Sequence, residues 1–263
     1  MSKIADVFKP GRKALIAYIT VGYPDMQATV NAALLLAKSG CDIIELGIPF
    51  SDPLADGATI QKASHHALMR GITPQLCLET AAAIRKKTAV PLVFMTYFNP
   101  VLNYGPEAFC RSCAQTGING LIVPDLPPEE GLLLEKTARN DNIDMIYLLA
   151  PASTDARITM VTARSRGFVY LVSLTGVTGA RKTLSPELQD FVKRVRRKTA
   201  QPLCIGFGIS TPEQAAHAGS LADGVIIGSR LIELMEEDST LNSLKSFIVA
   251  TRKALDSLKN TGR

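Results

Sequence analysis

The run CDIIELGI, at residues 41–48, is apolar over nearly its whole length. The run VYLVSL, at residues 169–174, has the same character. Strands of a parallel sheet read this way because helices cover both faces of the sheet, whereas a half-exposed strand alternates apolar and polar residues. The two runs therefore indicate a parallel β-sheet enclosed by helices.

Similar runs recur along the chain, and longer stretches with helical spacing separate them. Proline follows a hydroxyl residue at Thr73-Pro74, Ser185-Pro186 and Thr211-Pro212, which marks helix starts because the hydroxyl caps free N–H groups. We expect eight strands, at residues 14–21, 41–48, 90–97, 118–123, 143–149, 168–174, 202–207 and 224–227. We expect helices at residues 27–38, 75–87, 106–116, 129–141, 155–164, 186–198 and 212–218.

The alternation of strand and helix fits two architectures. An open doubly wound sheet that binds a dinucleotide carries a G-x-G-x-x-G turn after its first strand, but GYPD stands at that place here. Eight right-handed crossovers close most naturally into a barrel, and 263 residues match the usual size of one. We therefore predict an α/β fold, a single-domain (β/α)8 TIM barrel over residues 1–263 with extra helices.

Composition narrows the class of protein. Hydrophobic residues make up 46% of the chain and charged residues 20%, which excludes disorder as the main state. The net charge of +5 favours small anionic ligands and does not require nucleic acid. Five cysteines argue against a secreted disulfide framework, residues 1–12 lack a signal-peptide core, and no apolar stretch reaches the roughly 20 residues of a membrane span. We expect a soluble cytoplasmic protein with no nucleic-acid and no membrane partner.

Glu45 lies inside an apolar run, where burying an ionised carboxylate without a partner is costly. Loss of solvent would raise its pKa toward neutrality, which suits a general acid or base. A buried structural ion pair is the alternative. We favour a functional role because perturbed carboxylates are enriched in active sites.

Asp56 follows eleven residues later in the loop PFSDPLADG, which two prolines stiffen. A carboxylate on a rigid loop at the barrel mouth could accept a hydrogen bond from a substrate N–H or O–H. A cap on a helix beginning near Thr59, or a local turn before Gly57, accounts for Asp56 about as well.

Three glycine-rich segments follow the last three predicted strands, at residues 176–179, 206–210 and 228–229. Barrels commonly bind phosphate at this place, through backbone N–H groups and the N-terminus of a short helix. Three ordinary turns are the alternative. The neighbouring Arg230 could add charge to the site, or could equally point to solvent.

We predict no metal site. His65 and His66 are adjacent, so they diverge on a helix, and no second histidine stands four residues away. Cys110 and Cys113 form a lone C-x-x-C with no second pair.

The loop PFSDPLADG resembles the α subunit family of tryptophan synthase, and the resemblance extends over nearly the whole chain. That family is built on a (β/α)8 barrel, which agrees with the strand count. The segments that carry the resemblance, in chain order, are ELGIPFSDPLADG (45–57), IVPDLPPEE (122–130), SLTGVTGAR (173–181), and GFGISTPEQA with DGVIIGS (206–215 and 223–229).

The resemblance implies a lyase of tryptophan biosynthesis that cleaves indole-3-glycerol phosphate into indole and glyceraldehyde 3-phosphate. By matching position, Glu45 would protonate the indole carbon that loses its substituent and help to deprotonate the side-chain hydroxyl. Asp56 would bind the indole N–H and stabilise the positive charge that develops on the ring. The remaining substrate contacts implied by the resemblance are Ile60, Tyr170 and Phe207 around the indole, Thr178 on a closing loop, and Gly179, Gly208, Gly228 and Ser229 at the phosphate.

The resemblance also implies a partner. In this family the barrel joins a β subunit in an α2β2 complex, and indole passes to that subunit. Pyridoxal phosphate would belong to the β subunit, and this chain would hold no cofactor. The expected contact surfaces are the loop around Asp52, the Asn99-Pro100 loop and the loop at residues 175–184.

Three positions depart from the family pattern. Ala58 stands where proline is frequent, Tyr23 where aspartate is usual, and Arg230 where a small residue is common. Neither carboxylate is lost. Two rival functions stay open at this point: a phosphate-sugar isomerase or epimerase on the same barrel, since phosphate loops do not choose the chemistry, and a barrel that only regulates a partner enzyme.

Overall fold

The structure, a computed structural model, describes residues 2–172, 186–206 and 208–258. Its strands form one parallel sheet in the order β5-β4-β3-β2-β1-β9-β8-β7-β6. The eight predicted strands are confirmed within this part of the chain. Their bounds are β1 (Ala14–Thr20), β2 (Ile43–Gly47), β3 (Leu92–Met95), β4 (Ile118–Ile122), β5 (Asp144–Ile146), β6 (Leu148–Leu149), β7 (Val169–Val172), β8 (Leu203–Gly206) and β9 (Gly224–Ile227).

The two ends of this strand order meet at Tyr147, so the sheet closes into a barrel. β5 pairs with β4 and β6 pairs with β7, and only Tyr147 separates β5 from β6 in the chain. The Tyr170 N–H donates to the Tyr147 carbonyl at 3.1 Å, which continues the ladder across the join. β5 and β6 are thus two pieces of the single strand predicted at residues 143–149, and the barrel has the predicted eight-fold architecture.

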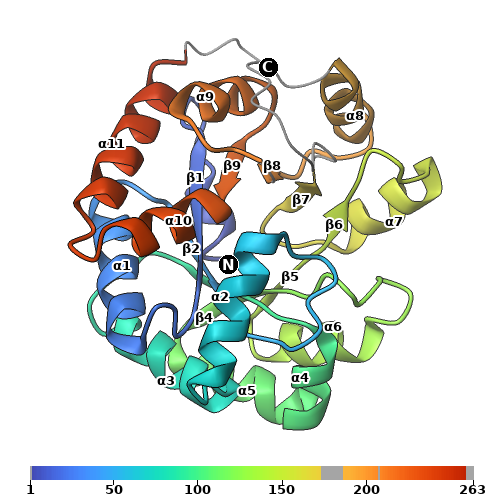
Figure 1. Ribbon diagram of the computed structural model, residues 1–263. Coiled ribbons are helices and arrows are strands. Elements are labelled where there is room, and N and C mark those ends of the chain that lie inside the picture. The colour runs from blue at the N-terminus through green and yellow to red at the C-terminus, as the bar shows by residue number, and fades with distance from the viewer. Residues whose placement is uncertain (1, 173–185, 207, 259–263) are drawn as a thin grey trace.

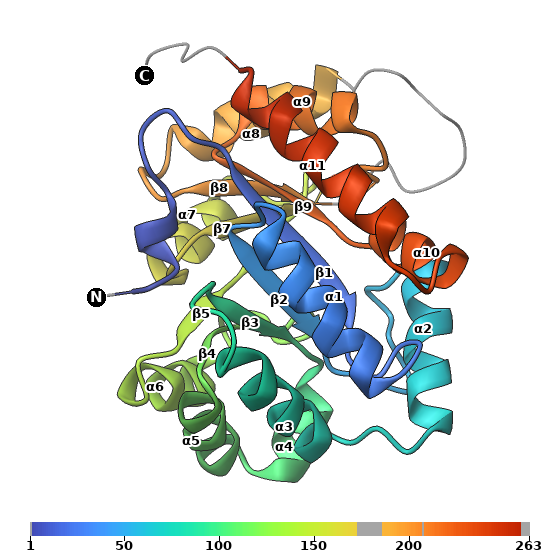
Figure 2. The same ribbon diagram turned by 90° about the vertical axis from the view of Figure 1, so that its left-hand side faces the viewer.

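Helices surround the strands on the outside (Figures 1 and 2). The seven predicted helices are confirmed, with ends that differ by a few residues. Four helices outside the predicted ranges are α2, α4, α10 and α11; the short α4 contains Pro100, which its first turn tolerates because no intrahelical N–H is needed there. The bounds are α1 (Met26–Lys38), α2 (Ala58–Met69), α3 (Pro74–Arg85), α4 (Phe98–Tyr104), α5 (Pro106–Thr116), α6 (Leu132–Asn140), α7 (Asp155–Arg164), α8 (Pro186–Arg196), α9 (Pro212–Leu221), α10 (Ser229–Glu237) and α11 (Asn242–Asp256).

Two of the three predicted helix caps are visible. The Thr73 hydroxyl accepts from the Leu76 N–H at 3.3 Å, and the Thr211 hydroxyl accepts from the Gln214 N–H at 3.2 Å. Ser185 lies outside the described residues. None of the helices in the described ranges has the length and hydrophobicity of a membrane span.

The barrel has two apolar layers. The larger one packs the outward side chains of the strands against the helices. The smaller one fills the interior, and it includes Ile16, Ile43, Val93, Ile122, Ile146 and Ile226. Ile4 joins this inner layer from the N-terminal segment, just before the short 3-10 helix η1 (Ala5–Val7). Figure 2 shows that segment at one end of the barrel and α2 and α10 at the other.

Two interior tyrosines lean over glycines of the next strand. A Cβ added to Gly47 would lie 2.6 Å from the Tyr18 ring carbon Cζ, and one added to Gly206 would lie 2.7 Å from the same atom of Tyr170. The absence of a side chain at these two glycines therefore leaves space for both rings. Both tyrosines line a cavity at the C-terminal mouth of the barrel, and Tyr170 also belongs to the inner apolar layer.

Candidate active site

A cavity of about 170 Å³ lies at the C-terminal ends of the strands, where barrel enzymes carry their active sites. Residues from β1, β2, β3, β7 and β9, from the loops that follow β2, β8 and β9, and from α2 and α10 line it. The lining residues are Tyr18, Glu45, Asp56, Gly57, Ile60, Met95, Tyr170, Gly208, Ile209, Ser210, Ile226, Gly228, Ser229, Arg230 and Glu233.

Glu45 stands on β2 between Tyr18 of β1 and Val93 of β3, and its residue is only 1% exposed. Neither carboxylate oxygen has a hydrogen-bond partner among the described residues, so the alternative of a buried structural ion pair finds no support there. Loss of solvent, reinforced by the nearby charge of Asp56, raises the pKa of Glu45 to about 8. At neutral pH this side chain is therefore mostly a neutral acid that can donate a proton.

Asp56 reaches the cavity from the loop between β2 and α2. The N-cap of α2 is Gly57 and no side chain caps the helix, so Asp56 is not the capping residue. Burial raises the pKa of Asp56 to about 6, although a hydrogen bond from Tyr97 acts in the opposite direction. Asp56 is therefore mainly ionised at pH 7, opposite a mainly neutral Glu45. Environments that separate two carboxylate pKa values in this way assign them different roles.

Tyr97, just after β3, fastens the Asp56 loop. Its hydroxyl accepts from the Ala55 N–H at 2.9 Å and bonds to the Asp56 carboxylate. Its ring stacks on Phe50 at the start of the same loop, with 5.1 Å between ring centroids. The loop is thus held to one aromatic side chain near both of its ends, which fixes the direction of Asp56.

Another part of the cavity is formed by the loop after β8 and by the start of α10. Gly208 has a φ of +74°, a conformation that favours glycine, and Gly228 is the N-cap of α10. No side chain caps α10, and the N–H groups of its first two residues have no carbonyl partner within the helix, whereas the Leu231 N–H donates to the Gly228 carbonyl at 2.8 Å. Such a helix start attracts anions through its free N–H groups and its dipole.

The predicted site residues fall into two groups. The structure brings together Glu45, Asp56, Ile60, Tyr170, Gly208, Gly228 and Ser229 around one cavity. Thr178, Gly179 and Phe207 lie outside the described residues, as does the loop at 175–184.

Sequence reasoning missed Tyr18, Tyr97, Met95 and Glu233. Tyr18 could have been found, because the parallel register of the first two predicted strands pairs it with Glu45. Tyr97 is the last residue of the strand predicted at residues 90–97, where it gives no signal of a separate role. Its role depends on contacts with a loop about forty residues away.

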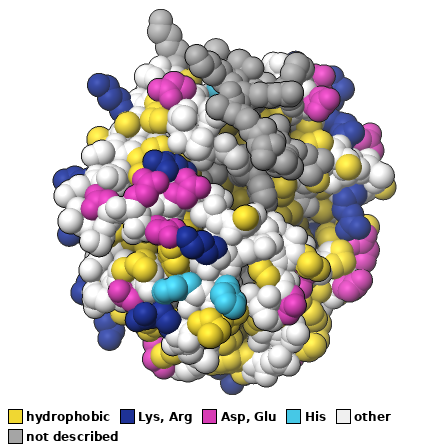
Figure 3. All heavy atoms as spheres, in the orientation of Figure 1, with side chains coloured by type: hydrophobic (Ala, Val, Ile, Leu, Met, Phe, Trp, Pro, Cys, Tyr) yellow, Lys and Arg dark blue, Asp and Glu magenta, His cyan; other side chains and the backbone are white. Residues whose placement is uncertain are grey.

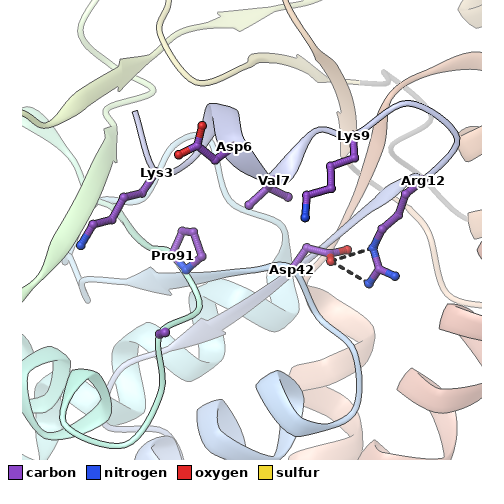
Figure 4. A pocket seen from close by; sticks show the side chains of 8 residues that line it. Lys3, Asp6, Val7, Lys9, Arg12, Asp42 and Pro91 are labelled. Carbon is purple, nitrogen blue, oxygen red and sulfur yellow. Dashed lines mark hydrogen bonds and ion pairs between the residues drawn. The ribbon is translucent and has the colours of Figure 1, made fainter. Parts of the chain in front are cut away.

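A larger hollow, of about 540 Å³, lies at the N-terminal ends of the strands (Figure 4). Its lining includes Lys3, Lys9 and Asp6, and Arg12 forms an ion pair with Asp42 at 2.8 Å. This hollow is wide, and no pair of buried titratable groups among the described residues faces it. Catalytic residues of barrels lie at the other end, so we assign the chemistry to the smaller cavity.

No group of three or more potential metal-ligating side chains gathers within the described ranges. Cys110 and Cys113 are buried in α5 as free thiols, and burial raises the pKa of both. His66 packs edge-on against Tyr23, with 5.2 Å between ring centroids, and His65 belongs to the same helix.

Comparison with known proteins places this geometry in context. The family model described as tryptophan synthase alpha chain matches residues 4–260. A curated tryptophan synthase alpha chain of Dehalococcoides mccartyi is 54% identical over 256 residues, covering 97% of this chain and all of its own length. One from Chloroflexus aurantiacus is 47% identical, covering 90% of this chain and 91% of its own.

Solved structures of tryptophan synthase chains have the same fold as this chain. A chain of Mycobacterium tuberculosis tryptophan synthase superposes with a TM-score of 0.91 at 40% identity, covering 97% of this chain and 98% of its own. Tryptophan synthase subunit alpha from Legionella pneumophila superposes with a TM-score of 0.90 at 34% identity, covering 98% of this chain and all of its own.

The burial of Glu45 predicts that the folded chain becomes less stable as the pH rises. An acid whose pKa rises on folding holds its proton more tightly in the folded chain than in the unfolded chain. The free energy of unfolding is therefore highest below the unfolded pKa of 4.5 and falls as the pH rises toward 8. Between pH 4.5 and 8, the free energy of unfolding of the wild type should fall by on the order of 4 kcal/mol relative to Glu45→Gln.

Denaturant unfolding at several pH values measures this difference. The matched control is Glu187→Gln, which removes an exposed carboxylate from α8 and should follow the wild type. A constant difference between the wild type and Glu45→Gln across this pH range would contradict the account of Glu45.

Proposed function

The chain belongs to the tryptophan synthase alpha chain family, and from this premise we propose that its cavity cleaves indole-3-glycerol phosphate into indole and glyceraldehyde 3-phosphate. The reaction is a retro-aldol cleavage, so the enzyme is a carbon–carbon lyase of tryptophan biosynthesis. The observation that carries the proposal is the buried Glu45, which has no hydrogen-bond partner in the described part of the chain and shares one cavity with Asp56 and with the start of α10.

Glu45 moves the proton. As a neutral acid it protonates the indole carbon that bears the glycerol side chain, and the resulting carboxylate accepts the proton of the adjacent side-chain hydroxyl. The bond between the ring carbon and the side chain then breaks, its electron pair returns to the ring, and the hydroxyl carbon becomes an aldehyde. Glu45 ends the cycle protonated. A pKa of about 8 suits both directions of transfer near neutral pH.

Asp56 stabilises the charge. Protonation of the ring carbon places positive charge on the indole nitrogen, and an ionised carboxylate next to its N–H stabilises that charge most strongly in a site with little water. The fixed loop geometry through Tyr97 supports this role, because a preorganised charge costs no reorganisation during the reaction.

The remaining contacts combine the lining of the cavity with the family resemblance. Phe207, Thr178 and Gly179 lie outside the described residues, so their roles rest on the resemblance alone. We propose that Tyr170 and Ile60, with Phe207, border the indole, and that Thr178 belongs to a loop that closes over Asp56. The phosphate would lie at Gly208, Gly228 and Ser229, together with Gly179. These assignments use the apolar strand ends for the ring and the free N–H groups of α10 for the anion.

The same proposal includes a β subunit in an α2β2 complex, which receives the indole and binds pyridoxal phosphate. This chain holds no cofactor in the proposal, because a carboxyl group can carry out both proton transfers and the protonated ring itself accepts the electron pair of the breaking carbon–carbon bond. Leu54, in the loop around Asp52, is 93% exposed, and Leu102 of α4 is 56% exposed. A contiguous exposed apolar patch marks a docking surface, and we propose that Leu54 and Leu102 belong to such a patch. We further propose a cytoplasmic location, in keeping with five unpaired cysteines.

The catalytic roles predict a large loss of turnover. Glu45→Gln should lower kcat for indole release by roughly 10²–10⁴-fold, since it removes general acid–base catalysis, with little change in KM. Asp56→Asn should lower kcat by about 100-fold, since it removes one preorganised charge. Steady-state kinetics with indole-3-glycerol phosphate, with and without the β subunit, provide the measurement.

Near-normal turnover in Glu45→Gln would contradict the mechanism. A wild-type chain that binds the substrate yet releases no indole in either setting would favour the regulatory alternative. Turnover of phosphorylated sugars without any requirement for an indole would favour the isomerase.

The docking surface predicts a separable loss of binding. Leu54→Asp should raise the Kd for the β subunit roughly 10-fold, because it places a charge in an apolar contact. The control is Met69→Asp, which changes a 75% exposed side chain at the C-terminal end of α2, away from the cavity mouth. Titration calorimetry measures both; equal affinities for Leu54→Asp and the wild type would place the interface elsewhere.

A further inference from the structure

Arg230 is the second residue of α10 and lines the part of the cavity formed by Gly208, Gly228 and Ser229. Its side chain is 30% exposed, so it lies between the cavity and the surface. This is the place where the proposed function puts the phosphate of the substrate.

The guanidinium of Arg230 is held by one of its terminal nitrogens. Nη1 donates to Glu233 at 3.1 Å and to Glu237 at 3.2 Å, and both carboxylates stand on α10 itself. Among the described residues, Nε and Nη2 have no hydrogen-bond partner, and neither atom is among the buried unpaired ones. One edge of a restrained guanidinium therefore remains free to donate.

The surroundings keep α10 in place. Thr59 of α2 bonds to Glu233 at 3.5 Å, and Lys62 of α2 forms an ion pair with Glu236 at 2.5 Å. Figure 3 shows the acidic and basic side chains gathered over α10 and the adjacent part of α2. The two carboxylates that hold Arg230 thus belong to a helix that is tied to its neighbour, which limits the positions open to the guanidinium.

We propose that Arg230 is a substrate-binding residue, whose free Nε–Nη2 edge donates to the phosphate of indole-3-glycerol phosphate at the start of α10. The inference rests on the proposed function and adds a charged contact to a site otherwise built from backbone N–H groups. A guanidinium edge matches two phosphate oxygens, and hydrogen bonds between charged groups are stronger than those from neutral amides. Arg230 also offsets the negative charge of Glu233, which lines the same cavity and would repel an incoming dianion.

Arg230→Gln tests the contact. This substitution removes the charge and the donor fork, so KM for indole-3-glycerol phosphate should rise roughly 10- to 100-fold while kcat changes less than about twofold. Arg230→Lys keeps the charge but lacks the two-pronged donor, so its KM should lie between those of the wild type and Arg230→Gln. The control Arg139→Gln removes an exposed charge from α6 and should leave KM unchanged.

A second measurement does not depend on turnover. Glycerol 3-phosphate serves as the probe in titration calorimetry, and glycerol is the uncharged comparison. The contact is supported if glycerol 3-phosphate binds more weakly to Arg230→Gln than to the wild type while thermal unfolding is unchanged. This result would support the contact even if the wild type released no indole. A wild type that releases no indole would overturn the proposed function alone. If the wild type is active and both KM and glycerol 3-phosphate affinity stay within twofold in Arg230→Gln and Arg230→Lys, Arg230 does not touch the phosphate.

Discussion

The whole site depends on keeping one carboxyl group away from water and without a partner. Glu45 is surrounded by a barrel interior of isoleucine, valine and tyrosine, and neither of its oxygens is paired among the described residues. Such burial costs free energy, which the extensive apolar layers of the barrel must offset. In return the side chain holds a proton at neutral pH, a property that a solvated glutamate does not have.

The barrel topology explains why the other groups meet Glu45. All strands are parallel, so their C-terminal ends open onto one mouth, and each following loop can add a side chain to it. The loop after β2 adds Asp56, the loop after β8 adds Gly208, and the turn after β9 begins α10. The parallel topology of the barrel therefore brings together a neutral acid, an ionised carboxylate and a helix start that can bind an anion.

Periodicity predicted the strands well because burial on both faces of a parallel sheet leaves long apolar runs. It also singled out Glu45, since a lone carboxylate in such a run is costly to bury unless it has a role in the site. Tyr97 and the contacts of Arg230 could not be predicted, because they depend on side chains that meet only after folding. One of the helices that the sequence did not predict is α4, because Pro100 interrupts its periodic pattern of apolar residues.

The family resemblance indicated the reaction, whereas the spacing of residues alone left several kinds of phosphate chemistry open. The single-domain assignment stays a prediction.

The proposed chemistry depends on the proton that Glu45 holds at neutral pH, and the titration of this side chain can be observed directly. In protein labelled with ¹³C at the glutamate side chains, one carboxyl resonance should be absent from Glu45→Gln, and that resonance identifies Glu45 in the wild type. This resonance should titrate with a pKa of about 8. Titration near 4.5, the ordinary value for a solvated glutamate, would contradict it.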